Sequence, residues 1–180
     1  MENVNLKKEL LTVIKNINDF PIKGVVFRDL TPILSHKGLL KKTIDQMLIF
    51  SKHLNFDCII SPESRGYWFG APLAYASNVP FVPARKPGKL PRDVISQNYY
   101  LEYGNNVLQI HSGDVKPNSR VLIVDDLIAT GGTIAALIEL TKKSNAIPVG
   151  CIFCASLSEL KGIEFIKSKY DVPCFKILDF

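Results

Sequence analysis

Two adjacent acids and a glycine turn follow an apolar run near the middle of the chain. Residues 121–124 contain no polar side chain, Asp125 and Asp126 come next, and residues 129–133 read Ala-Thr-Gly-Gly-Thr. Carboxylates can accept hydrogen bonds from vicinal hydroxyls or face a metal ion. Backbone N–H groups of a glycine loop at a helix N-terminus bind anions. A ligand with a phosphate beside a diol, such as a ribose 5-phosphate, suits both features.

The elements around this motif are readable from the apolar pattern. Residues 121–124 predict a central strand of a parallel sheet, buried on both faces. Apolar residues recur at helical spacing from Ile134 to Thr141 and predict a helix after the turn. Ligands bind at the carboxyl ends of such strands. The plain alternative is an ordinary strand, turn and helix, but two buried acids are costly unless they are used.

Neither of the two commoner nucleotide-binding loops is present in the sequence. The chain contains no Gly-x-Gly-x-x-Gly and no Gly-x-x-x-x-Gly-Lys-Ser/Thr. A dinucleotide-binding fold and a P-loop are therefore unsupported.

Length and composition indicate one globular domain. The chain has 180 residues, with 47% hydrophobic and 22% charged residues. We see neither a membrane-spanning run nor an apolar signal core, so we expect a cytoplasmic protein without a membrane partner. Cys151 and Cys154 form a C-x-x-C pattern inside an apparent strand, with no second pair. Buried reduced thiols are the better interpretation than a zinc or redox site.

Most of the net charge of +5 lies in residues 84–97. This segment has four basic residues against Asp93 and is broken by two prolines and a glycine, which predicts a mobile loop. A solvated, disordered loop is the plain alternative. Clustered cations on a hinged loop suit a compact polyanion such as pyrophosphate. A nucleic-acid surface would spread them along a face, so we expect no nucleic-acid partner. The basic residues are Arg85, Lys86, Lys89 and Arg92.

The remaining pattern predicts alternating strands and helices. We expect a first helix that ends near Asn18 and no clear periodicity in residues 20–34. A hairpin is expected on either side of residues 104–106. Alternation of this kind predicts an α/β fold with a mostly parallel sheet flanked by helices. Further helices are expected near 39–50, 67–76 and 157–166, and further strands near 58–60, 79–83, 148–155 and 172–178.

Two shorter segments could also bind a ligand. The loop at residues 63–66, Glu-Ser-Arg-Gly, follows a short buried strand and could bind an anion or a polar base, although a simple turn is equally consistent. Phe27 could stack on a flat ring. On physical grounds alone, a core phenylalanine is the preferred interpretation of that residue.

Residues 121–133 resemble the phosphoribosyl-diphosphate signature of the type I phosphoribosyltransferases. Nearly the whole chain is similar to the adenine phosphoribosyltransferase family. This wider similarity rests on residues 20–29, 63–66, 85–91 (RKPGKLP) and 100–104 (YLEYG). The departures are small: Tyr67 and Trp68 follow Arg-Gly where the family pattern has phenylalanine and another apolar residue.

The resemblance implies a role for each motif. Ribose hydroxyls are assigned to Asp125 and Asp126, and the 5-phosphate to Ala129, Thr130, Gly131, Gly132 and Thr133. Pyrophosphate is assigned to Glu63, Ser64, Arg65, Arg85, Lys86 and Lys89. Adenine is assigned to Val26, Phe27, Arg28 and Leu127, and the catalytic residues are Glu102 and Arg65.

The resemblance also implies the reaction and the organisation of the molecule. Adenine and 5-phosphoribosyl diphosphate would give AMP and diphosphate, with Mg²⁺ held mainly by the substrate and by no direct protein ligand. We expect a homodimer of one domain over residues 1–180, with a base-binding hood at about 1–35 and a flexible loop at about 84–103. One alternative is another 6-substituted purine as the substrate. The other is a regulator that senses phosphoribosyl diphosphate.

Overall fold

The computed structural model describes residues 4–101 and 104–180. The chain forms two compact units, residues 1–46 and 47–180. The predicted hood, at about residues 1–35, falls within the first unit, which extends to residue 46.

The first unit combines short helices with an antiparallel hairpin. It holds α1 (Val4–Val13), β1 (Lys15–Asn18), β2 (Val26–Asp29), α2 (Pro32–Ser35) and the first part of α3 (Leu39–Ser51). The expected first helix was therefore wrong at its end, because residues 15–18 pair with β2 instead. Asn16 and Asn18 are poor helix formers. The hairpin is closed by a turn in which Gly24 N–H donates to Asp19 Oδ1 at 2.7 Å.

The second unit is built on a five-stranded parallel sheet, which confirms the predicted fold class. Its strands are β3 (Cys58–Pro62), β4 (Phe81–Ala84), β7 (Arg120–Ile128), β8 (Ile147–Ser156) and β9 (Cys174–Asp179). Their order is β4-β3-β7-β8-β9, and every neighbouring pair is parallel. The helical elements are α4 (Tyr67–Ser77), α5 (Gly132–Lys143), the 3-10 turn η1 (Ser158–Leu160) and α6 (Gly162–Tyr170).

The core of the second unit includes β3 and the central strand β7. All of β3 is buried, and residues 121–124 of β7 have no exposed surface. Neither strand has a hydrophilic face, as expected for strands covered on both sides. Leu137 and Ile138 of α5 are also fully buried.

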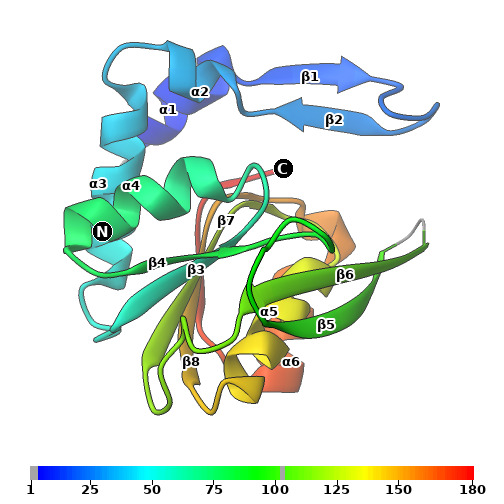
Figure 1. Ribbon diagram of the computed structural model, residues 1–180. Coiled ribbons are helices and arrows are strands. Elements are labelled where there is room, and N and C mark those ends of the chain that lie inside the picture. The colour runs from blue at the N-terminus through cyan, green and yellow to red at the C-terminus, as the bar shows by residue number, and fades with distance from the viewer. Residues whose placement is uncertain (1–3, 102–103) are drawn as a thin grey trace. The chain divides into compact units, whose positions relative to one another are not determined.

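The strand order places a topological switch point between β3 and β7. The chain moves from β3 outward to β4, and from β7 outward in the other direction to β8 and then β9. Right-handed crossovers in opposite directions put their helices on opposite faces. Figure 1 shows α4 on one face of the sheet and α5 with α6 on the other. Open α/β sheets bind ligands beside such a point, outside the carboxyl ends of the strands.

A separate antiparallel hairpin packs against α5. It consists of β5 (Val94–Leu101) and β6 (Gly104–His111), with Leu101 paired to Gly104. The expected turn at 104–106 was wrong, because these residues begin β6. The loop expected at residues 84–97 is also shorter than predicted. Residues 85–93 connect β4 to β5, and residues 94–101 form strand β5. Ile95 and Tyr99 pack on the core, which explains why this part of the segment is regular.

Candidate functional site

The acidic pair lies at the carboxyl end of β7, beside the switch point. Asp125 and Asp126 belong to the strand itself, which continues to Ile128, and they are only 7% and 5% exposed. The backbone N–H of Asp126 donates to Asp125 Oδ1 at 2.8 Å. Burial raises the pKa of Asp125 well above the usual aspartate value, and the charge of Asp126 raises it further. Ionising both carboxyl groups in the folded protein therefore costs free energy, because they are buried and repel each other.

The loop after β7 forms a small anion cradle. Residues 129–131 join β7 to the N-terminus of α5, and Gly131 has φ +88°, a conformation that favours glycine. A cavity of about 90 Å³ is lined by residues 127–134 together with Asp125. A water molecule takes roughly 30 Å³ of the liquid, so the cradle suits a compact polar group. Its backbone N–H groups stand at a helix N-terminus, where anions bind favourably.

A second glycine lets α6 approach this loop. A Cβ atom on Gly162 would lie 2.2 Å from the carbonyl oxygen of Ala129 and 2.9 Å from the nitrogen of Gly131. No larger residue fits there without moving the cradle, so Gly162 is a site-supporting residue that the sequence analysis did not identify.

The loop at residues 63–66, which follows β3, contacts the acidic pair of the neighbouring strand β7. An NH2 nitrogen of Arg65 lies 2.5 Å from Asp126 Oδ2. The same approach requires Gly66, because a Cβ atom there would lie 2.9 Å from Asp125 Oδ1 and 2.6 Å from Pro62 Cδ. The structure thus brings together Arg65 and the acidic pair, although about sixty residues separate them in the sequence.

Glu63 makes contacts that the sequence did not suggest. Arg85 Nε donates to Glu63 Oε2, and the backbone N–H of Lys86 donates to Glu63 Oε1, each at 2.8 Å. Burial would raise the pKa of Glu63, but the Lys86 N–H and the Arg85 guanidinium outweigh it and lower the pKa. The carboxylate is therefore ionised and holds the start of the basic loop.

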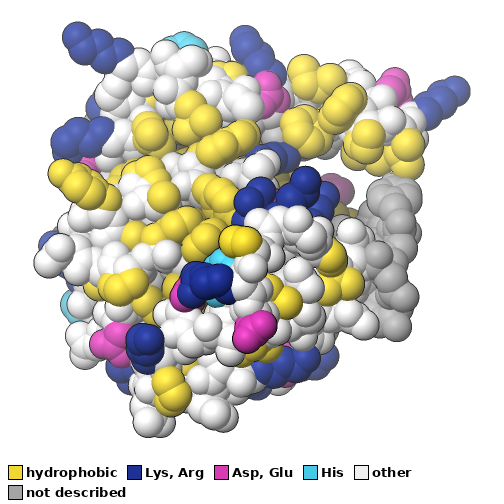
Figure 2. All heavy atoms as spheres, viewed as in Figure 1, with side chains coloured by type: hydrophobic (Ala, Val, Ile, Leu, Met, Phe, Trp, Pro, Cys, Tyr) yellow, Lys and Arg dark blue, Asp and Glu magenta, His cyan; other side chains and the backbone are white. Residues whose placement is uncertain are grey.

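Two of the four cations in the basic loop form ion pairs with carboxylates. Arg92 forms a bidentate ion pair with Asp114 at 3.0 and 2.9 Å, and Arg85 pairs with Glu63. Within the ranges that the structure describes, the ammonium groups of Lys86 and Lys89 have no carboxylate partner. On the face in Figure 2, Lys and Arg side chains form separate groups and no continuous stripe.

The expected base-binding segment lies in the first unit. Val26, Phe27 and Arg28 form most of β2, opposite residues 16–18 of β1. Phe27 is half-buried and meets Phe20 edge to face, with ring centroids 5.1 Å apart. Phe27 therefore packs against a neighbouring ring but is not fully buried. Leu127, assigned to the same ligand, lies in the second unit and is half-buried.

The expected catalytic Glu102 lies outside the described residues. It falls between β5, which ends at Leu101, and β6, which begins at Gly104.

Tyr99 of β5 is a further residue near the site. Its hydroxyl shares a hydrogen bond with the side chain of Thr133, and burial raises the pKa of the phenol. The alternation of the strand could have suggested an inward Tyr99, but no local signal could have named Thr133 as its partner.

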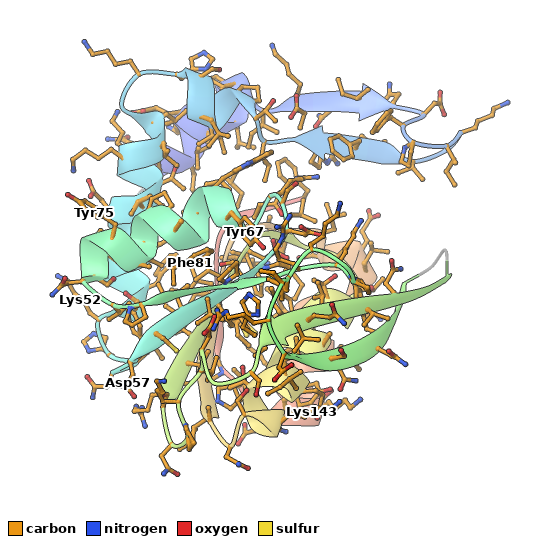
Figure 3. All side chains as sticks on the ribbon, viewed as in Figure 1. Lys52, Asp57, Tyr67, Tyr75, Phe81 and Lys143 are labelled. Atoms are coloured by element: carbon orange, nitrogen blue, oxygen red, sulfur yellow. The ribbon has the colours of Figure 1, made fainter. Side chains whose placement is uncertain are left out.

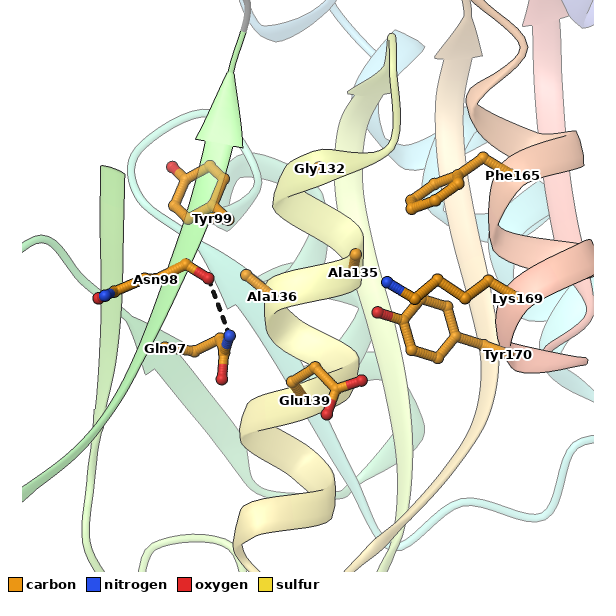
Figure 4. A pocket seen from close by; sticks show the side chains of 10 residues that line it. All are labelled: Gln97, Asn98, Tyr99, Gly132, Ala135, Ala136, Glu139, Phe165, Lys169 and Tyr170. Atoms are coloured by element: carbon orange, nitrogen blue, oxygen red, sulfur yellow. Dashed lines mark hydrogen bonds between the residues drawn. The ribbon is translucent and has the colours of Figure 1, made fainter. Parts of the chain in front are cut away.

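A larger hollow of about 380 Å³ lies between β5, α5 and α6 (Figure 4). Tyr99 contributes from β5, Glu139 from α5, and Phe165 and Lys169 from α6. It includes Gly132 of the anion cradle but neither acid. This hollow therefore borders the candidate site and does not coincide with it.

The contacts of Tyr67 show what the tyrosine adds where the family pattern has phenylalanine. Its hydroxyl donates to the carbonyl oxygen of Ala84 at 2.9 Å, and its ring meets Phe81 edge to face at 5.5 Å (Figure 3). A phenylalanine would keep the ring contact and lose the hydrogen bond. The tyrosine thus ties the start of α4 to the end of β4, where the basic loop begins.

Neither the cysteines nor the helices indicate another kind of site. All four cysteines are free thiols, and Cys151 and Cys154 are fully buried, as expected. No group of three or more potential metal-binding side chains occurs in residues 4–101 and 104–180. Over the same ranges, none of the helices combines the length and the apolar character needed to cross a lipid bilayer.

The family model for the phosphoribosyl transferase domain matches residues 33–180. The chain belongs to this family. Adenine phosphoribosyltransferase from Ureaplasma parvum serovar 3 is 47% identical over 156 residues, which are 87% of this chain and 90% of that protein. Within the phosphoribosyltransferases, the chain is therefore a member of the adenine phosphoribosyltransferase family.

Solved structures of adenine phosphoribosyltransferases share the fold. The enzyme from Thermoanaerobacter pseudethanolicus superposes with a TM-score of 0.91 at 42% identity, covering 96% of this chain and 99% of that one. The Saccharomyces cerevisiae enzyme, crystallised with adenine and an imino-altritol bisphosphate, gives a TM-score of 0.89 at 37% identity. That match covers 98% of this chain and 100% of the yeast chain.

Proposed function

We propose that the protein transfers the 5-phosphoribosyl group of phosphoribosyl diphosphate to N9 of adenine, giving AMP and diphosphate. The observation that carries this proposal is the buried acidic pair beside a glycine-lined anion cradle, in a chain of the adenine phosphoribosyltransferase family. The bond from the sugar to diphosphate breaks and the bond to adenine forms. Positive charge develops on the ribose while negative charge develops on the leaving group.

The acidic pair and the cradle would hold the phosphoribosyl group. Asp125 and Asp126 would accept hydrogen bonds from the ribose hydroxyls, and the positive charge developing on the sugar would favour two carboxylates nearby. The cradle would hold the 5-phosphate through backbone N–H groups and hydroxyls. Its proposed residues are Ala129, Thr130, Gly131, Gly132 and Thr133.

The two loops beyond β3 and β4 would bind the diphosphate. A guanidinium is a planar fork of donors that suits phosphate oxygens, and lysines add point charges. Closing such a loop would also exclude water from the reacting carbon. The proposed ligands are Ser64, Arg65, Arg85, Lys86 and Lys89, of which Arg65 would also reach the base, and Glu63 belongs to the same loop as Ser64 and Arg65.

The base-binding residues are proposed from the resemblance to the family. We assign adenine to Val26, Phe27, Arg28 and Leu127, and we assign proton handling at the purine to Glu102. The supporting observation in the first unit is that Phe27 of β2 is only half-buried. We further propose that residues 1–180 work as one phosphoribosyltransferase domain.

The acidic pair is compatible with a Mg²⁺ ion that arrives with the substrate. Mg²⁺ usually keeps several waters and binds one or two carboxylates together with substrate phosphates. Here the described residues offer two adjacent carboxylates, and Asp126 already pairs with Arg65. This donor set is too small for an all-protein site, so Asp125 and Asp126 would face an ion held mainly by the substrate. Bound in this way, Mg²⁺ would neutralise charge on the diphosphate oxygens.

We propose a homodimer in the cytoplasm. Helix α4 contains no charged residue, and its Tyr75 is 90% exposed. A helix that is apolar all round is normally covered, so α4 is a candidate for the dimer surface. Four free cysteines suit a reducing compartment.

Initial rates with adenine, hypoxanthine and guanine test the proposal. Adenine presents an amino donor and a ring acceptor where hypoxanthine reverses the pattern, so buried partners would be left unpaired. We expect strong preference for adenine in kcat/KM. Equal efficiency with hypoxanthine would contradict the assignment of the base while leaving the fold and the phosphoribosyl site intact.

A further inference from the structure

Both oxygens of the Glu63 carboxylate are occupied by groups at the start of the basic loop. Oε2 accepts from Arg85 Nε and Oε1 accepts from the backbone N–H of Lys86, each at 2.8 Å. The Glu63 side chain is only 13% exposed. A largely buried carboxylate with both oxygens engaged has little capacity left for a ligand.

The backbone around Glu63 is fastened to the same place. Glu63 N–H donates to the carbonyl oxygen of Ala84 at 2.8 Å, and the Tyr67 hydroxyl donates to that same oxygen at 2.9 Å. The loop after β3 and the end of β4 are therefore joined by backbone and side-chain bonds.

Arg85 forms hydrogen bonds with three other residues: Gln109, Glu63 and Lys89. Its backbone N–H and carbonyl oxygen exchange hydrogen bonds with Gln109 of β6, both at 2.8 Å. Its Nε is taken by Glu63, and its NH1 donates to the carbonyl oxygen of Lys89 at 3.2 Å. Among the described residues, its NH2 nitrogen makes no further hydrogen bond or ion pair. One edge of the guanidinium is thus fixed, and NH2 donors remain for a ligand.

We propose that Glu63 is a positioning residue for Arg85, which it holds in the orientation that receives the diphosphate, and that its carboxylate is not a diphosphate ligand. This inference rests on the proposed function. The physical reason is that a carboxylate repels an anion directly but can order a flexible arginine that attracts one. An arginine ordered before binding loses less side-chain freedom when the ligand arrives.

The two roles predict opposite signs for the same substitution. If Glu63 merely lined the diphosphate site, Glu63→Gln would remove a repulsive charge and tighten binding of the anion. If Glu63 positions Arg85, Glu63→Gln weakens the Arg85 contact and loosens binding. Glutamine keeps an oxygen for the Lys86 N–H, so the change is confined mainly to the charge opposite Arg85.

The test is calorimetric titration of the protein with magnesium pyrophosphate, without adenine. We expect Glu63→Gln to raise Kd about tenfold, equivalent to about 1.4 kcal/mol. Tyr67→Phe is the matched control, because it removes a neighbouring hydrogen bond to Ala84 and none of the hydrogen bonds of Arg85, and its Kd should stay within about twofold. In an Arg85→Ala background, Glu63→Gln should no longer weaken binding, since its effect acts through Arg85. Steady-state rates should show a rise in KM for phosphoribosyl diphosphate with little change in KM for adenine.

Tighter pyrophosphate binding by Glu63→Gln, or the same loss with and without Arg85, would overturn the inference. These results differ from a failure of the proposed function, which would appear as no AMP formation by the folded wild-type protein. If Glu63→Gln does not fold, Arg85→Lys tests the same contact. Lysine keeps the charge but lacks the Nε and NH2 pair, so we expect a similar rise in Kd. Unchanged binding by Arg85→Lys would also overturn the inference.

Discussion

An NH2 nitrogen of Arg65 lies 2.5 Å from Oδ2 of Asp126, so a cation from the loop after β3 faces an anion from the end of β7. Arg65 follows β3 and Asp126 lies in β7, and these two strands flank the topological switch point. Both belong to the site that we propose for phosphoribosyl diphosphate. Arg65 offsets part of the cost of burying two acids while no ligand is bound.

The acidic pair should reduce stability at neutral pH. The folded pKa of Asp125 is raised above its unfolded value of about 3.9. The contribution of Asp125 to the free energy of unfolding is therefore fully present at a pH below the unfolded pKa. It is lost as the pH rises through the folded pKa. Asp125→Asn should raise Tm at pH 7, by roughly 2–4 °C for each kcal/mol recovered. The difference should shrink near pH 4.

Thermal melts at both pH values check this prediction, with the exposed Glu159→Gln as a control. The same Asp125→Asn protein should lose roughly 10- to 100-fold in kcat/KM for phosphoribosyl diphosphate, because charge-assisted hydrogen bonds to the ribose are gone. An Asp125→Asn protein that is both less stable than wild type at pH 7 and fully active would contradict the proposed role of Asp125 in binding the ribose hydroxyls.

Lys86 and Lys89 should act on the ligand and not on the fold. Within the described ranges neither ammonium has a carboxylate partner, so Lys86→Ala with Lys89→Ala should leave Tm nearly unchanged. We expect KM for phosphoribosyl diphosphate to rise roughly 10- to 100-fold. Arg92→Ala is the comparison, since Arg92 pairs with Asp114 and should affect KM less. A large fall in Tm with normal kinetics for the lysine variant would show that the loop is structural.

Gly66 should tolerate no side chain. A Cβ atom would lie 2.6 Å from Pro62 Cδ and 2.9 Å from Asp125 Oδ1, so the loop or the acid must move. Gly66→Ala should destabilise the fold by roughly 1–3 kcal/mol and raise KM for phosphoribosyl diphosphate more than KM for adenine. Denaturant unfolding and steady-state kinetics measure the two effects. Wild-type values in both would show that the close approach of the loop to Asp125 is not required.

Glu102 should matter for chemistry more than for binding. If it handles a proton at the purine, Glu102→Gln should bind AMP about as well as wild type and lose roughly 10²–10⁴-fold in turnover. Glu102→Leu should lose more, because glutamine can still form a hydrogen bond. Single-turnover AMP formation at saturating substrates decides the matter. Unchanged rates in both variants would contradict the proposed role of Glu102.

The elements that could be predicted are those whose local pattern matches their burial. Residues 121–124 read as a central strand and are fully buried, and the helix expected at 67–76 is α4. Strand β1 could not be predicted, because all four of its residues are exposed and only its pairing with β2 defines it.

The candidate site was predictable as motifs but not as contacts. Asp125, Asp126 and residues 129–133 adjoin in sequence, so their proximity followed directly. The Glu63–Arg85 pair joins residues 22 positions apart, and only the β3–β4 register brings them together. Long-range partners of this kind leave no trace in local composition or periodicity.

The most direct test of the whole account follows labelled adenine into AMP in the presence of Mg²⁺ and phosphoribosyl diphosphate. Wild-type protein should convert adenine to AMP with one diphosphate released for each AMP. A folded Asp125→Asn/Asp126→Asn double variant, matched by circular dichroism, should be at least about 100-fold slower, as expected when two charge-assisted contacts are lost. Absence of labelled AMP with folded wild-type protein, or equal rates for the two proteins, would contradict it.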